Sequence, residues 1–169
     1  MSTTPARACG IDFGTSNSTV GWLRPGHGTL LPLEDGKPTL PSAVFFNADE
    51  ESTHYGRDAL QEYLEGYEGR LMRALKSLLG SNLMEGSTEV GGRALRYSDL
   101  LASFIGELKR RAERKVAELL AQLDAELARH GGDWFLGEHY SALDAYIFTL
   151  CRWTRGFANE RPARAWPHL

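Results

Sequence analysis

A short polar turn between two apolar runs carries the residues best suited to chemistry in this sequence. Asp12 lies at the end of the first run, and Gly14, Thr15, Ser16 and Asn17 follow it. A tight turn here would direct several backbone N–H groups and two hydroxyls into one concavity, a geometry that binds phosphate oxygens without a positive side chain. Asp12 would face the same space and could hold Mg²⁺ through water, because Mg²⁺ keeps several water ligands. The same residue types also form ordinary hairpin turns, so the turn alone leaves a purely structural role open.

The turn needs a strand on each side, and the flanking patterns predict a run of strands followed by helices. Strands are expected at residues 8–14, 18–23, 29–33, 43–46 and 53–56. Pro38 and Pro41 keep the intervening residues 39–40 extended. The apolar spacing then changes to three and four residues, which predicts helices over residues 57–67 and 71–79. Further on, Gly91-Gly92 has the character of a hairpin turn.

The second half of the chain has a helical pattern. Apolar residues recur every three or four positions from Leu100 to Leu127, up to a stop at Gly131-Gly132. This spacing predicts one amphipathic helix of about thirty residues. A break within residues 112–115 is the alternative, because such a helix is longer than usual.

A second helix is expected after an aromatic-rich loop. Ser141 can cap it while the Asp144 carboxylate reaches back to the backbone N–H of the cap residue, a variant of the capping box. We expect the aromatic residues of this segment to pack in a core, with an apolar ligand site as the alternative. These residues are Trp134, Tyr140, Tyr146 and Trp153.

Composition and charge exclude several classes of protein. The chain has 169 residues and a formal net charge of -3, whereas binding nucleic acid through bulk electrostatics requires a clustered basic face. No run reaches the roughly 18 apolar residues of a membrane-spanning helix, so we expect a cytoplasmic protein. Cys9 and Cys151 are far apart in the sequence and are expected to be buried, reduced thiols. The five histidines show no metal-ligand spacing.

Four stretches occur in a recognisable order along the first two thirds of the chain. They are residues 11–18, Asp35-Gly36 with Thr39-Leu40-Pro41-Ser42, Tyr55-Gly56 with Ala59, and residues 75–80. In this order they resemble the beginning of the ATPase domain of DnaK-type heat-shock chaperones, which belong to the actin-like ATPase superfamily. The resemblance covers about residues 8–113 and implies a partial actin-like ATPase fold.

The resemblance also implies roles for individual residues. Asp12, Gly14, Thr15, Ser16 and Asn17 match the first phosphate loop of the family, and Lys76 matches the lysine that reaches toward the terminal phosphate. A lysine in that position would stabilise charge developing in the transition state; without the resemblance, Lys76 would be read as a surface residue. The implied ligand is ATP or ADP with Mg²⁺. The family's second phosphate loop, of Asp-x-Gly-Gly type, is absent from this sequence, so we expect weak nucleotide binding without efficient hydrolysis.

Residues 115–169 resemble a different family. They include Asp133-Trp134-Phe135-Leu136-Gly137, the segment 140–146 around the capping box, and a closing pair of prolines, Pro162 and Pro167. These features are similar to the C-terminal helical domain of bacterial glutathione S-transferases. That family activates glutathione in a thioredoxin-like domain, for which this sequence has no βαβ signature. Glutathione binding and transferase activity are therefore not expected.

We therefore expect an α+β chain. An N-terminal mixed or antiparallel sheet with helices, residues 1–113, is joined through the long helix to an all-α segment, residues 114–169. The predicted function is nucleotide binding by a truncated chaperone-like domain that is not an efficient enzyme. The alternatives are a non-catalytic interaction or dimerisation module of glutathione S-transferase type and a fused gene remnant without a selected function. A protein partner or homodimer is compatible with these readings, whereas nucleic acid and membrane are not expected partners.

Overall fold

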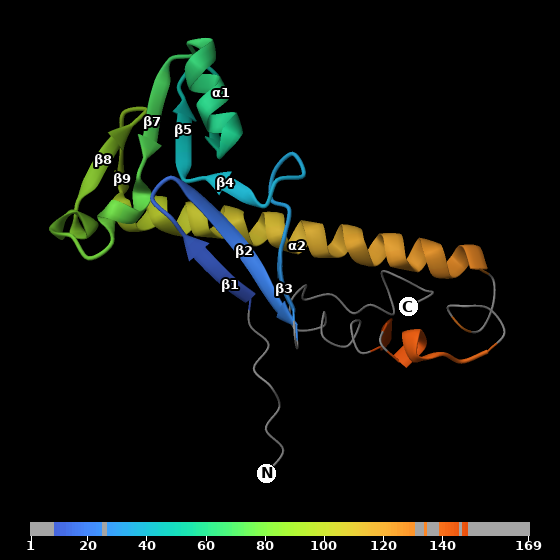
Figure 1. The fold of residues 1–169 in the computed structure, drawn as a ribbon. Coiled ribbons are helices and arrows are strands. Elements are labelled where there is room, and N and C mark those ends of the chain that lie inside the picture. Colours follow the sequence, from blue (N-terminus) through green and yellow to red (C-terminus); the bar gives the residue numbers. More distant parts are fainter. Residues whose placement is uncertain (1–8, 25–26, 131–133, 135–138, 146, 149–169) are drawn as a thin grey trace. The chain divides into compact units, whose positions relative to one another are not determined.

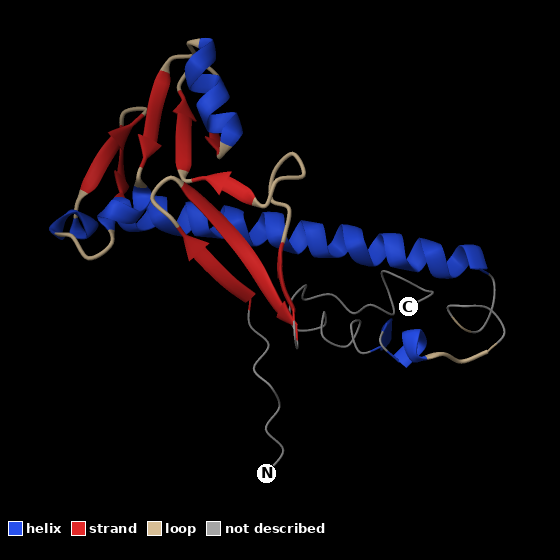
Figure 2. Cartoon of the chain, in the orientation of Figure 1, coloured by secondary structure: helices blue, strands red, loops and turns tan. Residues whose placement is uncertain are grey.

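The structure is a computed structural model that describes residues 9–24, 27–130, 134, 139–145 and 147–148. Its strands, with a short helix among them, are followed by one long helix, which confirms the predicted α+β class (Figure 1). The chain divides into two compact units, one formed by residues 9–112 and one that contains the residues from Glu113 onward. The described strands all belong to the first unit (Figure 2). This unit therefore holds the predicted phosphate site.

The first sheet is antiparallel and carries the polar turn. Its four strands are β1 (Cys9–Phe13), β2 (Asn17–Arg24), β3 (His27–Leu30) and β4 (Thr39–Pro41). β2 lies between β1 and β3, and β4 pairs with the beginning of β2. The third strand ends at Leu30 rather than continuing to residue 33, although the Leu31 N–H still donates to the Val20 carbonyl. Cys9 is a free thiol and is only half-buried.

A second antiparallel sheet is covered by the first helix. β5 (Ala43–Asn47) lies between β6 (Ser52–Tyr55) and β7 (Gly69–Arg73), and α1 (Arg57–Glu65) connects β6 to β7. Apolar residues of β5, β7 and α1 form one buried cluster: Ala43, Phe45, Ala59, Leu60 and Leu71. The Phe45 ring also meets Tyr63 edge-on, with ring centroids 6.4 Å apart. This cluster fixes α1 on the sheet, because burying apolar surface stabilises the contact by roughly 25 cal/mol per Å².

The predicted helix over residues 71–79 is wrong. The first part of that range is the end of β7, where Leu71 pairs with Phe45 and Met72 pairs with Val44. Ala74 then adopts a left-handed conformation with φ 54°, and the 3₁₀ helix η1 (Leu75–Leu78) follows. Sequence spacing alone could not separate these elements, because sheet pairing supplied by β5 outweighs the local helical period.

A small hairpin follows the second sheet. After a second 3₁₀ helix, η2 (Asn82–Glu85), the strands β8 (Ser87–Val90) and β9 (Arg93–Arg96) pair antiparallel. Gly91 and Gly92 form the predicted turn between them, with φ angles of 53° and 73°. Positive φ at both central residues is what a tight two-residue hairpin turn requires, so the glycine pair determines the turn.

Helix α2 (Tyr97–His130) is continuous over 34 residues. This confirms the predicted single long helix, and the alternative, a break within residues 112–115, does not occur. Its apolar stripe is buried at Leu100, Leu101, Phe104, Leu108, Ala112, Val116 and Leu120. Ile105 and Leu119, which the spacing placed in the same stripe, are exposed. In the part of the chain that the structure describes, no helix is both long and apolar enough to cross a membrane.

The second unit contains the predicted helix cap. The Ser141 N–H and hydroxyl both donate to Asp144 Oδ2 at 2.7 Å, and the Leu143 N–H donates to the Ser141 hydroxyl at 3.2 Å. This reciprocal arrangement confirms the capping box. Trp134 and Tyr140 meet edge-on, with centroids 5.1 Å apart, but both are exposed rather than buried. The predicted packing of Tyr146 and Trp153 lies outside the described residues.

Buried ion pairs hold the first unit together around one carboxylate. Glu34 lies before the tight turn at Asp35-Gly36, and its side chain is 5% exposed. Its carboxylate accepts bonds from Arg57 Nη1 and Arg111 Nη1, each at 2.8 Å, and from the Arg57 backbone N–H. The last of these bonds satisfies a donor at the beginning of α1, where Gly56 supplies no side-chain cap. Glu34 thus joins a turn, a short helix and α2.

Glu107 extends this cluster along α2. Burial alone would raise the pKa of Glu107, but hydrogen bonds from Arg111 and Arg110 outweigh it and lower the pKa below the ordinary value of 4.5. Burial likewise opposes the charge on Arg111, while hydrogen bonds to Glu107 and Glu34 raise its pKa. The Glu107 carboxylate therefore contributes stability that is present above the unfolded-state pKa and is lost as the pH falls through the lower folded-state pKa.

Candidate functional site

The candidate phosphate-binding turn consists of residues 14–16, between β1 and β2. Pairing of Phe13 with Ser18 and of Asp12 with Thr19 brings the two strands together at this point. A Cβ atom at Gly14 would clash with the carbonyl oxygen of Asn17. Residue 14 must therefore be glycine, because the backbone of Asn17 lies so close to it. Phosphate loops use glycine in a similar way, where the backbone comes close to the ligand.

Two buried serines support the backbone of the turn through hydrogen bonds. Ser42 donates from its hydroxyl to the Gly14 carbonyl at 2.8 Å, and its backbone N–H donates to the Ser16 carbonyl at 2.9 Å. The Ser18 hydroxyl lies 2.9 Å from the Ser42 hydroxyl, and both residues are almost fully buried. Because both carbonyls are held from one side, the backbone of the turn is fixed before any ligand arrives.

The groups that would contact a ligand remain available. The side chains of Asp12, Thr15, Ser16 and Asn17 are exposed, and none of them makes a hydrogen bond or ion pair with another described residue. The backbone N–H groups of Thr15 and Ser16 also have no acceptor among the residues placed by the structure. The turn thus presents donors and hydroxyls on a fixed backbone, as an anion-binding nest does.

The strand that leads into the turn is anchored on α2. The Phe13 ring packs against Phe104, with centroids 5.8 Å apart and the planes inclined by 40°. Phe104 is fully buried, as are Val20 on β2 and Leu40 on β4. The position of the turn therefore depends on the apolar contacts beneath the first sheet.

Lys76 belongs to a different element from the turn. It sits in η1, after β7 of the second sheet, and its side chain is exposed. Within the described ranges, the structure gives Lys76 no hydrogen bond or ion pair to any member of the turn. Asp12, Gly14, Thr15, Ser16 and Asn17 thus lie together at the turn between β1 and β2, and the role of Lys76 stays a prediction.

The sequence reasoning missed the bracing role of Ser18 and Ser42. Both residues lie in the stretches that resemble the chaperones. For Ser42, a weak signal existed in its position, because it is a hydroxyl residue between Pro41 and the apolar run 43–46, at the junction of β4 and β5. For Ser18, only the hydrogen bond itself reveals its role.

The comparisons with known proteins decide the family. A family model described as Hsp70 protein matches residues 8–118. The chain belongs to the Hsp70 family. The match begins at the first sheet and extends into α2, so it includes the turn and its two serine braces. A model described as glutathione S-transferase, C-terminal domain, matches residues 106–169. The two matches overlap within α2, which places similarity to both families in one continuous helix.

Individual relatives of this Hsp70 chain are chaperones. A chaperone protein HscA homolog of Vibrio parahaemolyticus is 40% identical over 78 residues, which is 46% of this chain and 12% of the relative. A chaperone protein HscA homolog of Aeromonas salmonicida is 45% identical over 56 residues, 33% of this chain and 9% of the relative. The aligned part thus spans only about a tenth of these relatives' length.

Proposed function

We propose that the chain binds the phosphates of ATP or ADP, with Mg²⁺, at the turn of residues 14–16, weakly and without efficient hydrolysis. The observation that carries the proposal is the turn itself. Its carbonyls are held by Ser42, while the N–H groups of Thr15 and Ser16 have no acceptor among the described residues. Such a fixed set of donors binds phosphate oxygens at little cost in reorganisation. Membership of the Hsp70 family supports a nucleotide as the source of the phosphate.

Asp12 is the proposed contact to the metal. Its carboxylate is exposed at the end of β1, one residue before Phe13, and has no lysine or arginine partner among the residues that the structure describes. Mg²⁺ bound to nucleotide phosphates keeps most of its waters, so one carboxylate reaching those waters is sufficient. Lys76 is proposed as the residue that approaches the terminal phosphate, which requires that its exposed side chain extend toward the bound nucleotide.

Calorimetry with the full chain and Mg-ADP or Mg-ATP tests the proposal. We expect saturable binding with a Kd on the order of 0.1–1 mM. Thr15→Ala removes a hydroxyl and Lys76→Ala a charge, and each is expected to weaken binding about threefold to tenfold, the size of a hydrogen bond or ion pair to phosphate. Phosphate release is expected to be no faster with the wild type than with Thr15→Ala.

Matched controls come from the same unit. Thr53→Ala and Lys37→Ala change an exposed threonine and an exposed lysine that lie outside the turn, and both should leave the Kd unchanged. Glutathione at the same concentration should give no heat. Absence of saturable heat with either nucleotide, or equal losses in the control variants, would reject the phosphate site.

A second candidate function is homodimerisation through the segment similar to glutathione S-transferases. The observation that favours it is Leu119, a leucine that is 44% exposed in the part of α2 covered by that match. Contact of this side chain with a second copy of the chain would remove apolar surface from water.

Light scattering after size-exclusion chromatography tests this second function. We expect a dimer for the wild type and a monomer for Leu119→Asp, because a charge cannot be buried without a partner. Ala121→Asp adds the same charge at an exposed position on the other side of the helix and should remain dimeric. A monomeric wild type, or dissociation of both variants alike, argues against the dimer.

A further inference from the structure

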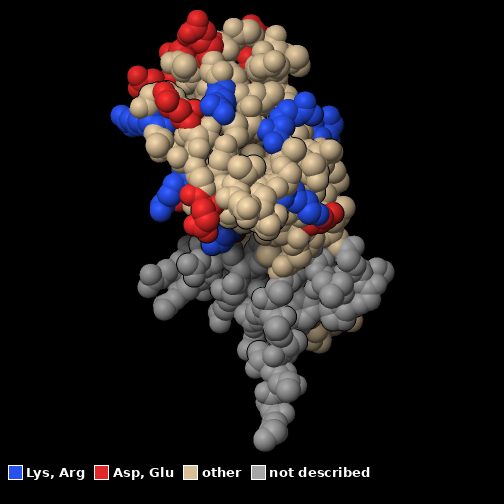
Figure 3. All heavy atoms as spheres, turned by 90° about the vertical axis from the view of Figure 1, so that its left-hand side faces the viewer, with Lys and Arg blue, Asp and Glu red and all other residues tan. Residues whose placement is uncertain are grey.

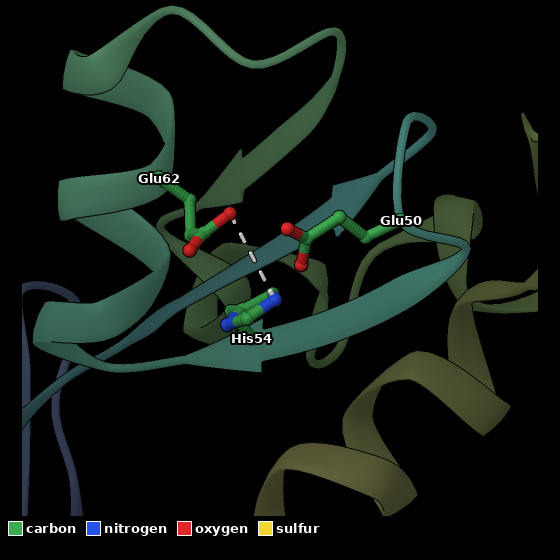
Figure 4. A group of neighbouring side chains, drawn as sticks. All are labelled: Glu50, His54 and Glu62. Atoms are coloured by element: carbon green, nitrogen blue, oxygen red, sulfur yellow. Dashed lines mark ion pairs between the residues drawn. The ribbon is translucent and has the colours of Figure 1, made fainter.

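Three potential metal ligands converge where α1 lies beside the second sheet. Glu50 comes from the turn between β5 and β6, His54 from β6 and Glu62 from α1 (Figure 4). One ligand atom of each lies within 4.8 Å of the others, and His54 Nε2 is 3.9 Å from Glu62 Oε2. Figure 4 shows the three side chains directed toward one space from three different elements.

A buried amide holds both carboxylate residues in place. The Asn47 side chain donates from Nδ2 to Glu62 Oε2 at 2.6 Å, and its Oδ1 accepts from the Glu50 backbone N–H at 3.0 Å. Asn47 is 3% exposed and lies at the end of β5. Amides that orient the ligands in this way are a feature of metal sites, where such outer partners fix the direction of the coordinating groups.

The charge around the three residues is negative and is not neutralised by nearby basic side chains. Among the described residues, neither Glu50 nor Glu62 forms an ion pair with lysine or arginine. Glu50, then Glu62 and Glu65, raise the pKa of the neighbouring Tyr67 hydroxyl, which agrees with a concentration of carboxylates. In Figure 3, the uppermost charged atoms of the molecule are acidic, at the end that carries α1 and the β5–β6 turn.

We propose that Glu50, His54 and Glu62 bind one divalent transition-metal ion of the Zn²⁺ type, with water as the fourth ligand. Imidazole favours Zn²⁺ and its neighbours over Mg²⁺ and Ca²⁺, which prefer all-oxygen sites. Tetrahedral ligands with bonds near 2.1 Å lie roughly 3.4 Å apart, so the exposed Glu50 side chain must move inward slightly. The bound ion connects the β5–β6 turn, β6 and α1, and therefore stabilises the fold of this sheet. This site is separate from the phosphate-binding turn.

One contact competes with the metal. The Ser52 hydroxyl lies 2.7 Å from His54 Nε2 and must release it when the lone pair of that nitrogen turns to the ion. Ser52→Ala removes this competitor, so it is expected to bind the metal at least as tightly as the wild type.

Titration of the full chain with Zn²⁺, in the absence of nucleotide, tests the proposal by calorimetry. We expect one equivalent to bind, and we expect His54→Ala and Glu62→Gln each to weaken binding about tenfold or more, since each removes a ligand. Glu50→Gln changes only an exposed side chain in a turn, so it tests the ligand role without endangering the fold, and it should also weaken binding. Zn²⁺ should raise the melting temperature of the wild type but not that of His54→Ala.

The matched controls are His139→Ala and Glu65→Gln, which change an exposed histidine and an exposed glutamate outside the three ligands. Both should bind Zn²⁺ within about twofold of the wild type. Co²⁺ in place of Zn²⁺ should give the visible absorption of a tetrahedral site without a thiolate band, because Cys9 is not a ligand. The proposal is overturned by the absence of binding at about 1 mM Zn²⁺, by a thiolate band, by unchanged binding in His54→Ala, or by loss of binding in Ser52→Ala or either control.

Discussion

Replacement of Glu34 by alanine is expected to lower the free energy of unfolding by about 3–5 kcal/mol, the usual cost of removing one partner from a buried ion pair. The Arg111 side chain is 10% exposed, and Glu34 at 2.8 Å is one of its two closest carboxylate partners. The change would leave this guanidinium charge partly uncompensated. It would also leave the Arg57 N–H at the start of α1 without its acceptor. Urea denaturation followed by circular dichroism measures the effect.

The neighbouring residue Arg110 provides the control. It also forms an ion pair with Glu107, but its side chain is 63% exposed. Arg110→Ala should therefore cost no more than about 1 kcal/mol, as exposed pairs do. If Glu34→Ala costs no more than Arg110→Ala, the buried cluster does not hold the unit together.

Phe104→Ala is expected to destabilise the first unit by about 3–5 kcal/mol through the cavity it leaves. Phe104 is fully buried in α2 and packs on Phe13, the last residue of β1. Because Phe13 directly precedes the phosphate-binding turn, the same change should weaken nucleotide binding under conditions in which the variant is still folded. Denaturation and calorimetry together measure the two effects.

Ile105 is the matched control for this prediction, since it is the next residue of α2 and is 38% exposed. Ile105→Ala should cost less than about 1 kcal/mol, because its side chain retains much of its contact with water in the folded state. A loss for Phe104→Ala no larger than that of Ile105→Ala would show that the Phe13–Phe104 contact does not support β1.

Local sequence signals predicted those parts of the fold whose cause is local. The Gly91-Gly92 turn follows from the need for positive φ, and the cap at Ser141 follows from the reach of Asp144 to a residue three positions earlier. The polar turn after Phe13 was found for the same reason. Each of these features needs only neighbours in the sequence, so residue type and spacing are enough to indicate it.

Features that depend on distant partners could not be predicted in this way. Glu34 lies beside an Asp-Gly turn and resembles a surface residue; its burial depends on Arg57 and Arg111, which are 23 and 77 residues away. Leu71 and Met72 follow a helical spacing, yet they pair with β5. Residue type and spacing therefore predict structure where the contacts are local, but not where the sheets bring segments together that are distant in the sequence.

The candidate site shows the same division. Residue type was sufficient to single out Thr15 and Ser16, but the support from Ser42 required the pairing of β2 with β4 to become visible. His54 gave no signal, because its companions Glu50 and Glu62 are unremarkable in spacing and come together only through a turn and a helix.

The capping of α1 by Glu34 has a consequence for the order of folding. A helix of nine residues is marginal by itself in water, and Gly56 provides no side-chain cap to begin it. The backbone N–H of Arg57, at the start of α1, finds its acceptor only when the Glu34 carboxylate, 23 residues earlier in the chain, lies beside it. We therefore expect α1 to form late in folding, after Glu34 and Arg57 have come together, rather than to act as a folding nucleus.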